Sequence, residues 1–260
     1  MAKVALITGA SRGIGRATAE EFAKAGYQVA ANFCSSGQAA EEFTRQMAQQ
    51  GHSVLPCQAD VSDPQQVEQM VQTVLQQFGH IDVLVCNAGI ARQGLLTDFT
   101  PEDWRRMMAV NLDGTFYCCR SVLPSMIRRH SGSIITTSSI WGLTGASCEV
   151  PYSAAKAGII GLTKALAKEV GPSGQLHRAR RGGHRDERRP RAGGDGSAAG
   201  GNAAVYHRDS AADCTGFAVF GRGAGILCDR SGHQSKRWIS LLIITPENKI
   251  PNAIEQHPIS

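Results

Sequence analysis

The 260-residue chain is predicted to be an α/β protein, with a doubly wound parallel sheet between two layers of helices. Short apolar runs alternate five times with stretches of helical period up to about Gly174. Runs such as Val83-Leu84-Val85 are continuously apolar, which is typical of parallel strands buried on both faces. The first run leads through a glycine-rich turn into a helix. These observations predict one three-layer α-β-α domain over residues 1–174.

The individual elements are bounded by recognisable end signals. The predicted strands are Lys3–Thr8, Gln28–Phe33, Ser53–Ala59, Ile81–Cys86 and Ser133–Thr137. The predicted helices are Ile14–Ala25, Gln38–Gln50, one from Pro64 to just before Gly79, a long one from Pro101, and Pro151–Val170. Ser62 or Asp63 is suited to cap the third helix and Thr100 the fourth, each followed by proline at the first helical position.

Composition excludes several classes of protein. An apolar fraction of 42% supports a sizeable core. No apolar run approaches the roughly 20 residues of a membrane helix, and no signal peptide is visible, so we expect no membrane association. The eight cysteines form no Cys-x-x-Cys pair and no metal-like spacing. Free thiols, no metal site and a cytoplasmic location are therefore expected.

The turn Thr8-Gly9-Ala10-Ser11-Arg12-Gly13-Ile14-Gly15 follows a strand and opens a helix. Glycines let the backbone approach a pyrophosphate, and the helix N-terminus offers it free N–H groups and a positive dipole. The turn alone is weak evidence, but its place in the first β-α unit predicts a dinucleotide site. The cofactor-binding candidates here are Gly9, Ser11, Arg12, Gly13, Ile14 and Gly15.

The end of the second strand indicates which dinucleotide is used. A carboxylate there would hold the ribose hydroxyls of NAD, but the chain has Asn32-Phe33-Cys34-Ser35-Ser36. Arg12 is available to pair with a 2′-phosphate. NADP(H) is therefore the expected cofactor, and Asn32 joins the binding candidates. The alternative is that Arg12 is only a solvated loop charge.

Ser139, Tyr152 and Lys156 form a candidate catalytic set. Tyr152 and Lys156 are four residues apart, so a helix places them on one face. A neighbouring ammonium would lower the pKa of the tyrosine from its usual value of about 10. The tyrosine could then protonate a ketone oxygen as hydride arrives, and Ser139 could hydrogen-bond the same oxygen. The alternative is a surface pair, because any helix can carry Tyr-x-x-x-Lys.

Together with Asn87-Ala88-Gly89 and Asn111, these motifs resemble the short-chain dehydrogenase/reductase family, over residues 1–174 in order and spacing. The resemblance is greatest to the bacterial 3-oxoacyl-acyl-carrier-protein reductase group. It implies a Rossmann-like fold and NADPH-dependent carbonyl reduction, as in fatty-acid synthesis. It also implies roles for individual residues: Tyr152 as general acid, Lys156 also on the nicotinamide ribose, Ser139 on the carbonyl, Asn111 on a proton-relaying water, Asp60 and Val61 beside the adenine, and Asn87, Ala88 and Gly89 along the cofactor cleft.

The natural substrate is less constrained. The segment from Ser139 to Val150 lies over the active site in this family and resembles a subgroup thought to reduce an aminopentanone group on elongation factor P. Glu149 would suit a cationic amine, and the alternative is that it is a solvated loop charge. Arg128-Arg129-His130 could dock an acidic acyl carrier protein, or cap a helix C-terminus.

After Gly174 the β-α pattern stops. Residues 1–174 hold 14 basic and 14 acidic side chains, whereas residues 175–260 hold 13 and 8, so the whole net charge of +5 lies in the tail. One reading is a nucleic-acid-binding arm. However, reading permitted codons for residues 175–187 from the second base allows N-C-I-A-P-G-V-V-D-T-E-M-N, and for Cys228 to Ile239 allows V-T-G-Q-V-I-R-V-N-G-G-F. The resemblance implies sequences of this kind at both places.

We therefore interpret residues 175–260 as a frameshifted segment that binds no nucleic acid and orders poorly. On this interpretation the last sheet strands of the family are missing or replaced. The nicotinamide-carboxamide loop is lost as well, together with segments that build the usual homotetramer. The chain as written could then be an inactive product that keeps only the cofactor fingerprint.

Overall fold

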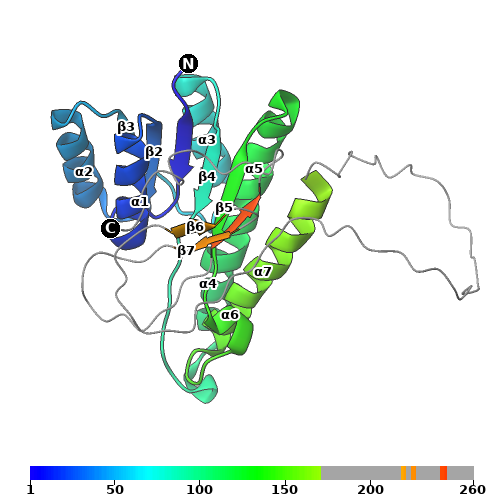
Figure 1. Cartoon of the computed structure of the whole chain (residues 1–260). Helices are drawn as coiled ribbons and strands as arrows, with labels where there is room; N and C mark the ends of the chain where they lie inside the picture. The colour runs from blue at the N-terminus through cyan, green and yellow to red at the C-terminus, as the bar shows by residue number, and fades with distance from the viewer. Residues whose placement is uncertain (171–217, 221–223, 227–240, 245–260) are drawn as a thin grey trace, which may run out of the picture.

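The computed structural model describes residues 1–170 together with three short strands at 218–220, 224–226 and 241–244. A central sheet separates two helical layers (Figure 1). Helices α1 (Gly13–Lys24) and α2 (Gly37–Gln49) cover one face. Helices α3 (Pro64–Phe78), α5 (Gly114–Arg129) and α7 (Val150–Val170) cover the other. This arrangement confirms the predicted α-β-α layers.

Five parallel strands form the sheet in the order β3-β2-β1-β4-β5. Their bounds are Val4–Ile7 (β1), Gln28–Phe33 (β2), Val54–Gln58 (β3), Val83–Cys86 (β4) and Ser133–Thr137 (β5). The chain leaves β1 toward β2 and β3 and later returns to β4 on the other side of β1. The doubly wound order therefore creates a crevice at the carboxyl ends of β1 and β4, where such sheets bind ligands.

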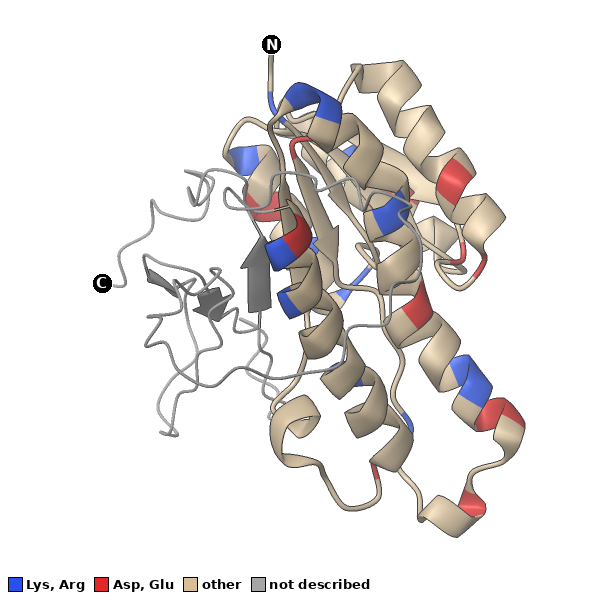
Figure 2. Ribbon diagram, turned by 90° about the vertical axis from the view of Figure 1, so that its right-hand side faces the viewer, with Lys and Arg blue, Asp and Glu red and all other residues tan. Residues whose placement is uncertain are grey.

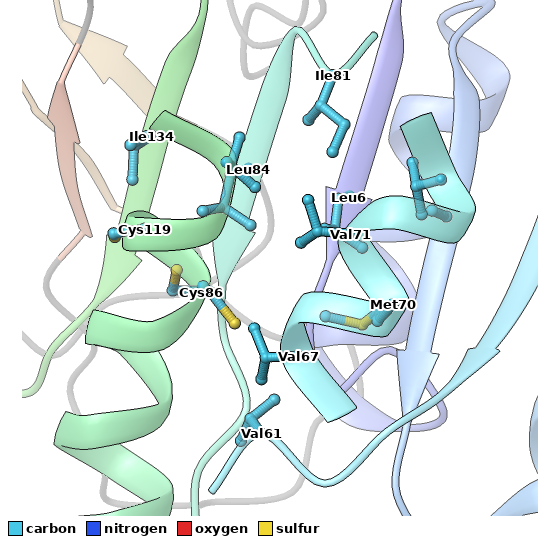
Figure 3. Packing of buried hydrophobic residues seen from close by; sticks show 14 of the residues in the cluster. Leu6, Val61, Val67, Met70, Val71, Ile81, Leu84, Cys86, Cys119 and Ile134 are labelled. Carbon is cyan, nitrogen blue, oxygen red and sulfur yellow. The ribbon is translucent and has the colours of Figure 1, made fainter. Parts of the chain in front are cut away.

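Alternate side chains of each central strand enter different cores. Leu6, Leu84 and Ile134 pack against α3 and α5 (Figure 3), whereas Ile7 and Val85 pack against α1 and α2. All five side chains are at most 2% exposed. The continuous apolar runs of the sequence thus reflect strands that are buried on both faces.

Three thiols meet in the core between β4 and α5. The Cys86 thiol hydrogen-bonds with Cys118 and Cys119, and these contacts together with burial raise its pKa well above the ordinary value. No thiol here is more than 4% exposed. Such thiols behave as packing groups, because reactivity needs an accessible thiolate.

The helix caps follow the sequence closely. Asp63, rather than Ser62, caps α3 and accepts hydrogen bonds from the backbone N–H groups of Gln65 (2.9 Å) and Gln66 (3.3 Å). Thr100 caps α4 (Pro101–Met108) in a reciprocal capping box with Asp103. These caps fix where two of the helices that border the site begin.

The predicted single helix from Pro101 is wrong in one respect. It is divided into α4, a π-helical turn η2 (Ala109–Asp113) and α5. Two further short elements were not predicted, a 3-10 turn η1 (Leu96–Asp98) and helix α6 (Trp141–Thr144). The fourth strand begins at Val83 instead of Ile81, and just before it the Asp82 carboxylate accepts the N–H of Val4 (2.8 Å).

A sixth strand, β8 (Leu241–Ile244), lies antiparallel to β5 at the edge of the sheet. The other two strands, β6 (Ala218–Phe220) and β7 (Ala224–Ile226), pair only with each other. The edge position beside β5 is therefore filled by an antiparallel strand from the tail. Residues 175–201, which the sequence predicts to lack a packing partner, lie outside the described residues.

Figure 2 shows basic and acidic residues interspersed along the described helices. This agrees with the equal numbers of basic and acidic residues in residues 1–174. Among the helices that the structure describes, none is both long and apolar enough to cross a membrane.

Candidate active site

The glycine-rich turn connects β1 to α1 at the carboxyl edge of the sheet. Helix α1 begins after Arg12 with no side-chain cap and no acidic residue in its first turn. Helices α3 and α4, by contrast, have side-chain caps, Asp63 and Thr100. The first N–H groups of a helix have no intrahelical partner, so the start of α1 is suited to bind an anion.

Glycines shape this turn for a ligand. Gly9 (φ +66°) and Gly13 (φ +55°) have left-handed backbone conformations that favour glycine. A Cβ on Gly9 would lie 2.9 Å from the Cα of Ala88, and one on Gly15 would overlap the carbonyl oxygen of Gly9. A Cβ on Gly13 would meet nothing within 4 Å. The turn is thus packed tightly against the end of β4 and remains open at Gly13, which fits a pyrophosphate.

Two asparagine side chains hold the turn in place. Asn87 donates from Nδ2 to the carbonyl oxygens of Thr8 (3.0 Å) and Gly9 (3.3 Å). Asn32 accepts the N–H of Gly9 at Oδ1 (3.2 Å) and donates from Nδ2 to the carbonyl of Ala59 (3.0 Å). Asn32 is 1% exposed, so its side chain positions the turn from within the core.

The residues after β2 carry no carboxylate toward the cleft. Cys34 and Ser35 are exposed, Ser36 is half-buried, and Arg12 is exposed at the start of α1. Hydroxyl groups and a guanidinium are therefore the polar side chains available at this end. Ser11, in the glycine-rich turn, and Ile14, in the first turn of α1, are half-buried.

Ser139, Tyr152 and Lys156 lie close to the carboxyl end of β5. They are 0%, 9% and 4% exposed. The Lys156 ammonium donates to the carbonyl of Thr137 (3.0 Å) and lies 5.5 Å from the centroid of the Tyr152 ring. Tyr152 and Lys156 thus share a buried face of α7, which excludes the reading as a surface pair.

Burial also sets the charge properties of Lys156. It lowers the pKa of the ammonium to about 8, because desolvation disfavours the charged form. The backbone around Lys156 is fixed by Ser138, whose hydroxyl donates to the Lys156 carbonyl (2.8 Å). Thr137 and Ser138 are positioning groups that sequence reasoning missed, because backbone acceptors and serines leave no distinctive pattern.

Asn111 lies in the π-helical turn η2 and is fully buried. Its Nδ2 donates to the carbonyls of Ile90 and Met107 (2.9 Å each). Its Oδ1 forms no hydrogen bond within the described part of the chain. A Cβ on Gly89 would lie 2.7 Å from this oxygen and 3.6 Å from the Lys156 Nζ. A buried acceptor without a partner thus faces the same small space as the ammonium, which suits a bound water.

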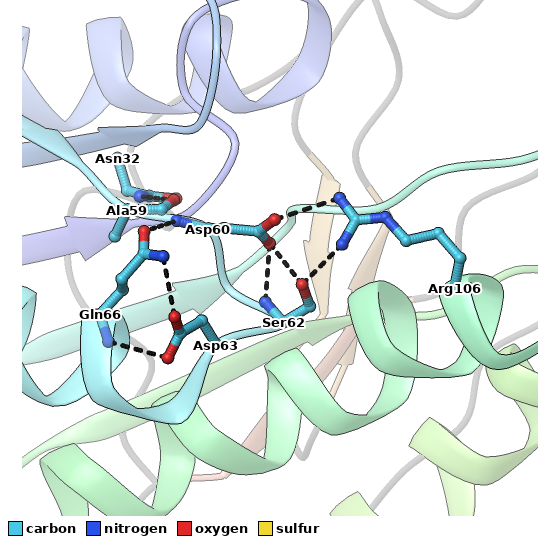
Figure 4. A network of polar contacts seen from close by, with 7 residues as sticks. All are labelled: Asn32, Ala59, Asp60, Ser62, Asp63, Gln66 and Arg106. Carbon is cyan, nitrogen blue, oxygen red and sulfur yellow. Dashed lines mark hydrogen bonds and ion pairs between the residues drawn. The ribbon is translucent and has the colours of Figure 1, made fainter.

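Asp60 and Val61 follow β3 at the other end of the crevice. Val61 is 5% exposed and packs against Gly114, where a Cβ would lie 2.9 Å from Val61 Cγ2. Asp60 accepts hydrogen bonds from the backbone N–H and hydroxyl of Ser62 and from Arg106 (Figure 4). Sequence reasoning missed Arg106, because two arginines in an exposed helix usually form only a solvated face.

Glu149 is 3% exposed, so its interpretation as a solvated loop charge is wrong. Its Oε1 accepts the Nε2 of Gln93 (3.0 Å), and the carbonyl of Cys148 next to it accepts the N–H of Gly94 (2.9 Å). The two loops that flank the start of α7 are therefore joined three residues before Tyr152. The loop from Ser139 to Val150 lies beside the catalytic set as expected.

The basic cluster Arg128-Arg129-His130 lies at the other edge of the sheet. Arg129 donates to the Asp82 carboxylate (2.7 Å) and to the Ile81 carbonyl (3.2 Å), and Arg128 is exposed. Arg129 thus binds the start of β4 and not the last carbonyls of its own helix. The cluster precedes β5, whereas Ser139 follows β5. The length of this strand therefore separates the cluster from Ser139 by about 20 Å.

Comparison with known proteins agrees with this geometry. A family model described as short chain dehydrogenase matches residues 3–176. A protein of Staphylococcus aureus named 3-oxoacyl-[acyl-carrier-protein] reductase FabG is 43% identical over 174 residues, which is 67% of this chain and 71% of the relative. A Synechocystis protein named 3-oxoacyl-[acyl-carrier-protein] reductase is 43% identical over 173 residues, 66% of this chain and 70% of the relative.

A third relative, 3-oxoacyl-[acyl-carrier-protein] reductase FabG of Thermotoga maritima, is 42% identical over 168 residues, 65% of this chain and 68% of the relative. These matches support an oxidoreductase that acts on carbonyl or hydroxyl groups with a nicotinamide cofactor. The chain belongs to the short chain dehydrogenase family.

Proposed function

We propose that residues 1–174 form the core of an NADPH-dependent reductase that acts on 3-oxoacyl groups carried on an acyl carrier protein. The observation that carries this proposal is the buried group of Ser139, Tyr152 and Lys156 beside the unpartnered oxygen of Asn111. Sequence similarity to proteins named 3-oxoacyl-[acyl-carrier-protein] reductase supports the substrate class.

NADPH supplies the hydride when it is bound. In the proposed reaction the Tyr152 hydroxyl donates a proton to the ketone oxygen, and the Ser139 hydroxyl hydrogen-bonds that oxygen as its negative charge develops. The positive charge of Lys156 favours loss of the Tyr152 proton, and its ammonium would hold a ribose hydroxyl of the cofactor. Asn111 Oδ1 holds a water through which the proton on Tyr152 is replaced from solvent.

The glycine-rich turn and the start of α1 would hold the pyrophosphate, with Gly89 and Ala88 lining the cleft beyond it. Arg12 and the hydroxyls of Ser35 and Ser36 would hold the 2′-phosphate, because no carboxylate follows β2 to repel it.

The test uses purified protein, NADPH or NADH, and an acetoacetyl thioester. It includes the full chain and a frame-restored chain, in which the family-like reading frame replaces residues 175–260. We expect the frame-restored chain to oxidise NADPH with the thioester and to bind NADPH at least about tenfold tighter than NADH, or roughly 1.4 kcal/mol. Equal affinity for the two cofactors would contradict the assignment of NADP(H). Absence of turnover with the thioester would contradict the proposed substrate class.

A second candidate substrate is an aminoketone, such as the aminopentanone modification of elongation factor P. The burial of Glu149 favours it, because a desolvated carboxylate near Tyr152 would attract an ammonium group more strongly than a solvated one. In the frame-restored chain, Glu149→Gln should then raise the Michaelis constant of an aminoketone at least about tenfold and leave the acetoacetyl thioester nearly unchanged. An equal effect on both substrates would remove this candidate.

A carrier protein would have to reach the site from its docking surface. If it docks at Arg128 and Arg129, charge reversal there should raise the Michaelis constant for carrier-bound substrate only. Because Arg129 also binds Asp82, Arg128→Glu is the cleaner variant. An unchanged constant for carrier-bound substrate would exclude this docking site.

A further inference from the structure

The position of the catalytic set fixes how a dinucleotide must lie across the crevice. Tyr152 and Lys156 lie beside β5, and the phosphate-binding turn follows β1. The sheet order places β2 and β3 on the side of β1 away from β5. An extended dinucleotide with its reactive ring at Tyr152 therefore has its adenine end over β2 and β3. Asp60 lies there, two residues after β3 ends.

One arginine from a distant helix reaches this end of the crevice. Arg106 of α4 donates from Nη2 to Asp60 Oδ2 (3.1 Å) and from Nη1 to the Ser62 hydroxyl (2.7 Å), as Figure 4 shows. The hydroxyl of Ser62 in turn donates to Asp60 Oδ1 (2.6 Å). Arg106 and Asp60 are 46 residues apart, so this is a tertiary contact between α4 and the loop after β3.

The same loop is bonded to the phosphate-binding turn. Asn32 accepts the N–H of Gly9 and donates to the carbonyl of Ala59, the residue before Asp60. On the other side, Gln66 accepts the N–H of Asp60 (2.9 Å) and donates to Asp63 (2.9 Å). The backbone of Asp60 is thus fixed relative to the site where the pyrophosphate would bind, and Arg106 fixes its carboxylate.

We propose that Arg106 is a positioning residue for the adenine end of the cofactor, and that it acts through Asp60. This inference rests on the proposed dinucleotide-dependent function. A lone carboxylate at this point would repel the phosphates of the cofactor. The Arg106 guanidinium compensates that charge and orients the carboxylate, which keeps lone pairs that can accept the exocyclic amine of adenine.

The charge state of Asp60 agrees with this role. Burial raises its pKa, but hydrogen bonds from Ser62 and Arg106 and the positive charge of Arg106 outweigh burial, so the pKa lies below the ordinary value. Asp60 is therefore ionised at neutral pH and acts as a hydrogen-bond acceptor.

The adjacent arginine provides a matched control. Arg105 is in the same helix but pairs with Glu102 three residues earlier (2.8 Å), and its side chain is 72% exposed. Arg105→Gln and Arg106→Gln remove the same charge from the same helix. Only the second removes a bond to the loop after β3. A general effect of net charge on an anionic cofactor would appear equally in both variants.

The experiment titrates NADPH and 2′,5′-ADP into the full chain and into the frame-restored chain, each as the parent and as the variants Arg105→Gln, Arg106→Gln, Asp60→Asn and Arg106→Gln/Asp60→Asn. Thermal unfolding is the folding check, and variants are compared in a parent that unfolds cooperatively. We expect Arg106→Gln to raise both dissociation constants about three- to fivefold, in keeping with a partly exposed ion pair, and Arg105→Gln to change them less than about 1.5-fold. In the Asp60→Asn background, Arg106→Gln should raise the two dissociation constants less than about twofold, because the Asp60 charge that Arg106 compensates is gone.

The thermal midpoint of Arg106→Gln should stay within about 2 °C of the parent, since an exposed ion pair contributes little to stability. Equal effects of the two arginine variants would overturn the inference. So would an undiminished effect of Arg106→Gln in the Asp60→Asn background. A folded parent chain that binds neither nucleotide would overturn the proposed function together with it. A parent that binds both, with no response to Arg106→Gln, would overturn the inference alone.

Discussion

A single residue, Tyr152, separates turnover from cofactor binding. In the proposed reaction its hydroxyl gives up a proton, but it is not needed to hold the pyrophosphate. In the frame-restored chain, Tyr152→Phe should lower turnover about a hundredfold or more, the usual contribution of a general acid. The NADPH dissociation constant should change less than about twofold. Steady-state kinetics and fluorescence titration measure the two quantities. Near-normal turnover in Tyr152→Phe would exclude its role as proton donor.

Lys156 should behave differently, because it serves both the tyrosine and the ribose. Lys156→Ala is expected to lower turnover and also to weaken NADPH binding. A variant that lost turnover but bound NADPH normally would show that the ammonium does not contact the cofactor.

The charge of Lys156 also predicts a pH dependence. Its pKa of about 8 in the folded chain lies below the ordinary value of 10.5. Above about pH 8 the folded enzyme loses this ammonium, so kcat/KM for ketone reduction should fall with increasing pH, by up to about tenfold per pH unit. A kcat/KM that stays level to pH 10 would contradict the assignment.

The effect of the same group on stability has the opposite sign. Between about pH 8 and 10.5 the unfolded chain binds more protons at Lys156 than the folded chain does. The contribution of Lys156 to the free energy of unfolding therefore rises with pH across that window and is lowest below it. The signal of a labelled Lys156 side chain in NMR would give the folded pKa directly.

The roles of individual residues could be predicted where a motif fixes their spacing. They could not be predicted where the role depends on whether the side chain is buried and on what it contacts. Tyr152 and Lys156 share a helical face because they are four residues apart, which needs no tertiary information. The burial of Glu149 and the reach of Arg106 to Asp60 depend on loops and helices that are distant in the chain. A charged residue in a polar segment has the same local pattern in either situation.

At the scale of elements, the close contact between α6 and α7 depends on glycine. A Cβ on Gly142 would lie 2.7 Å from the Lys156 carbonyl carbon, whereas one on Gly161 in α7 would meet nothing within 4 Å. Gly142→Ala should therefore displace the loop that carries Ser139, lower the free energy of unfolding by about 1–3 kcal/mol and reduce turnover.

Gly161→Ala is the matched control for this substitution. It should raise the free energy of unfolding by about 0.5–1 kcal/mol, because alanine favours a helix interior more than glycine does. Chemical denaturation of both variants measures the difference. Similar stabilities for the two would show that α6 can move away from Lys156 at no cost.

The elements themselves were mostly readable from the sequence, and the exceptions have physical causes. The strands Gln28–Phe33 and Ser133–Thr137 have the predicted bounds, and each follows closely on a glycine, Gly26 and Gly132. The π-helical turn at Ala109–Asp113 was not predicted. It adds a residue to one turn without changing the helical composition, and packing of Asn111 against Ile90 and Met107 is visible only in three dimensions.

At the scale of the whole molecule, the order β3-β2-β1-β4-β5 follows from five β-α units with right-handed crossovers. This order brings residues from the first and last described helices to one edge of the sheet. The antiparallel pairing of β8 with β5 could not be derived in the same way. The β-α pattern of the sequence stops at about Gly174, so the crossover rule places no strand beyond it.

The tail bears on the activity of the whole molecule. The family model matches residues 3–176, and residues 175–187 and 228–239 permit sequences of the kind that the resemblance implies when codons are read in one shifted frame. We propose that residues 175–260 are an out-of-frame product. Residues 175–201 contain few apolar side chains to offset an ordering cost of about 1–2 kcal/mol per residue.

The chain as written should therefore show rapid proteolysis after about residue 174, a low thermal midpoint or aggregation, and little reductase turnover. A native protein is stabilised by only about 5–15 kcal/mol in total, so exchanging the last parallel strand of its sheet for an unrelated segment removes a large share of that stability. The frame-restored chain should regain protease resistance, cooperative unfolding and turnover together. Sequencing the coding DNA around codon 175 tests the cause independently. A cooperatively folded, fully active 260-residue product would instead establish the tail as a functional replacement, with β8 serving as a genuine edge strand beside β5.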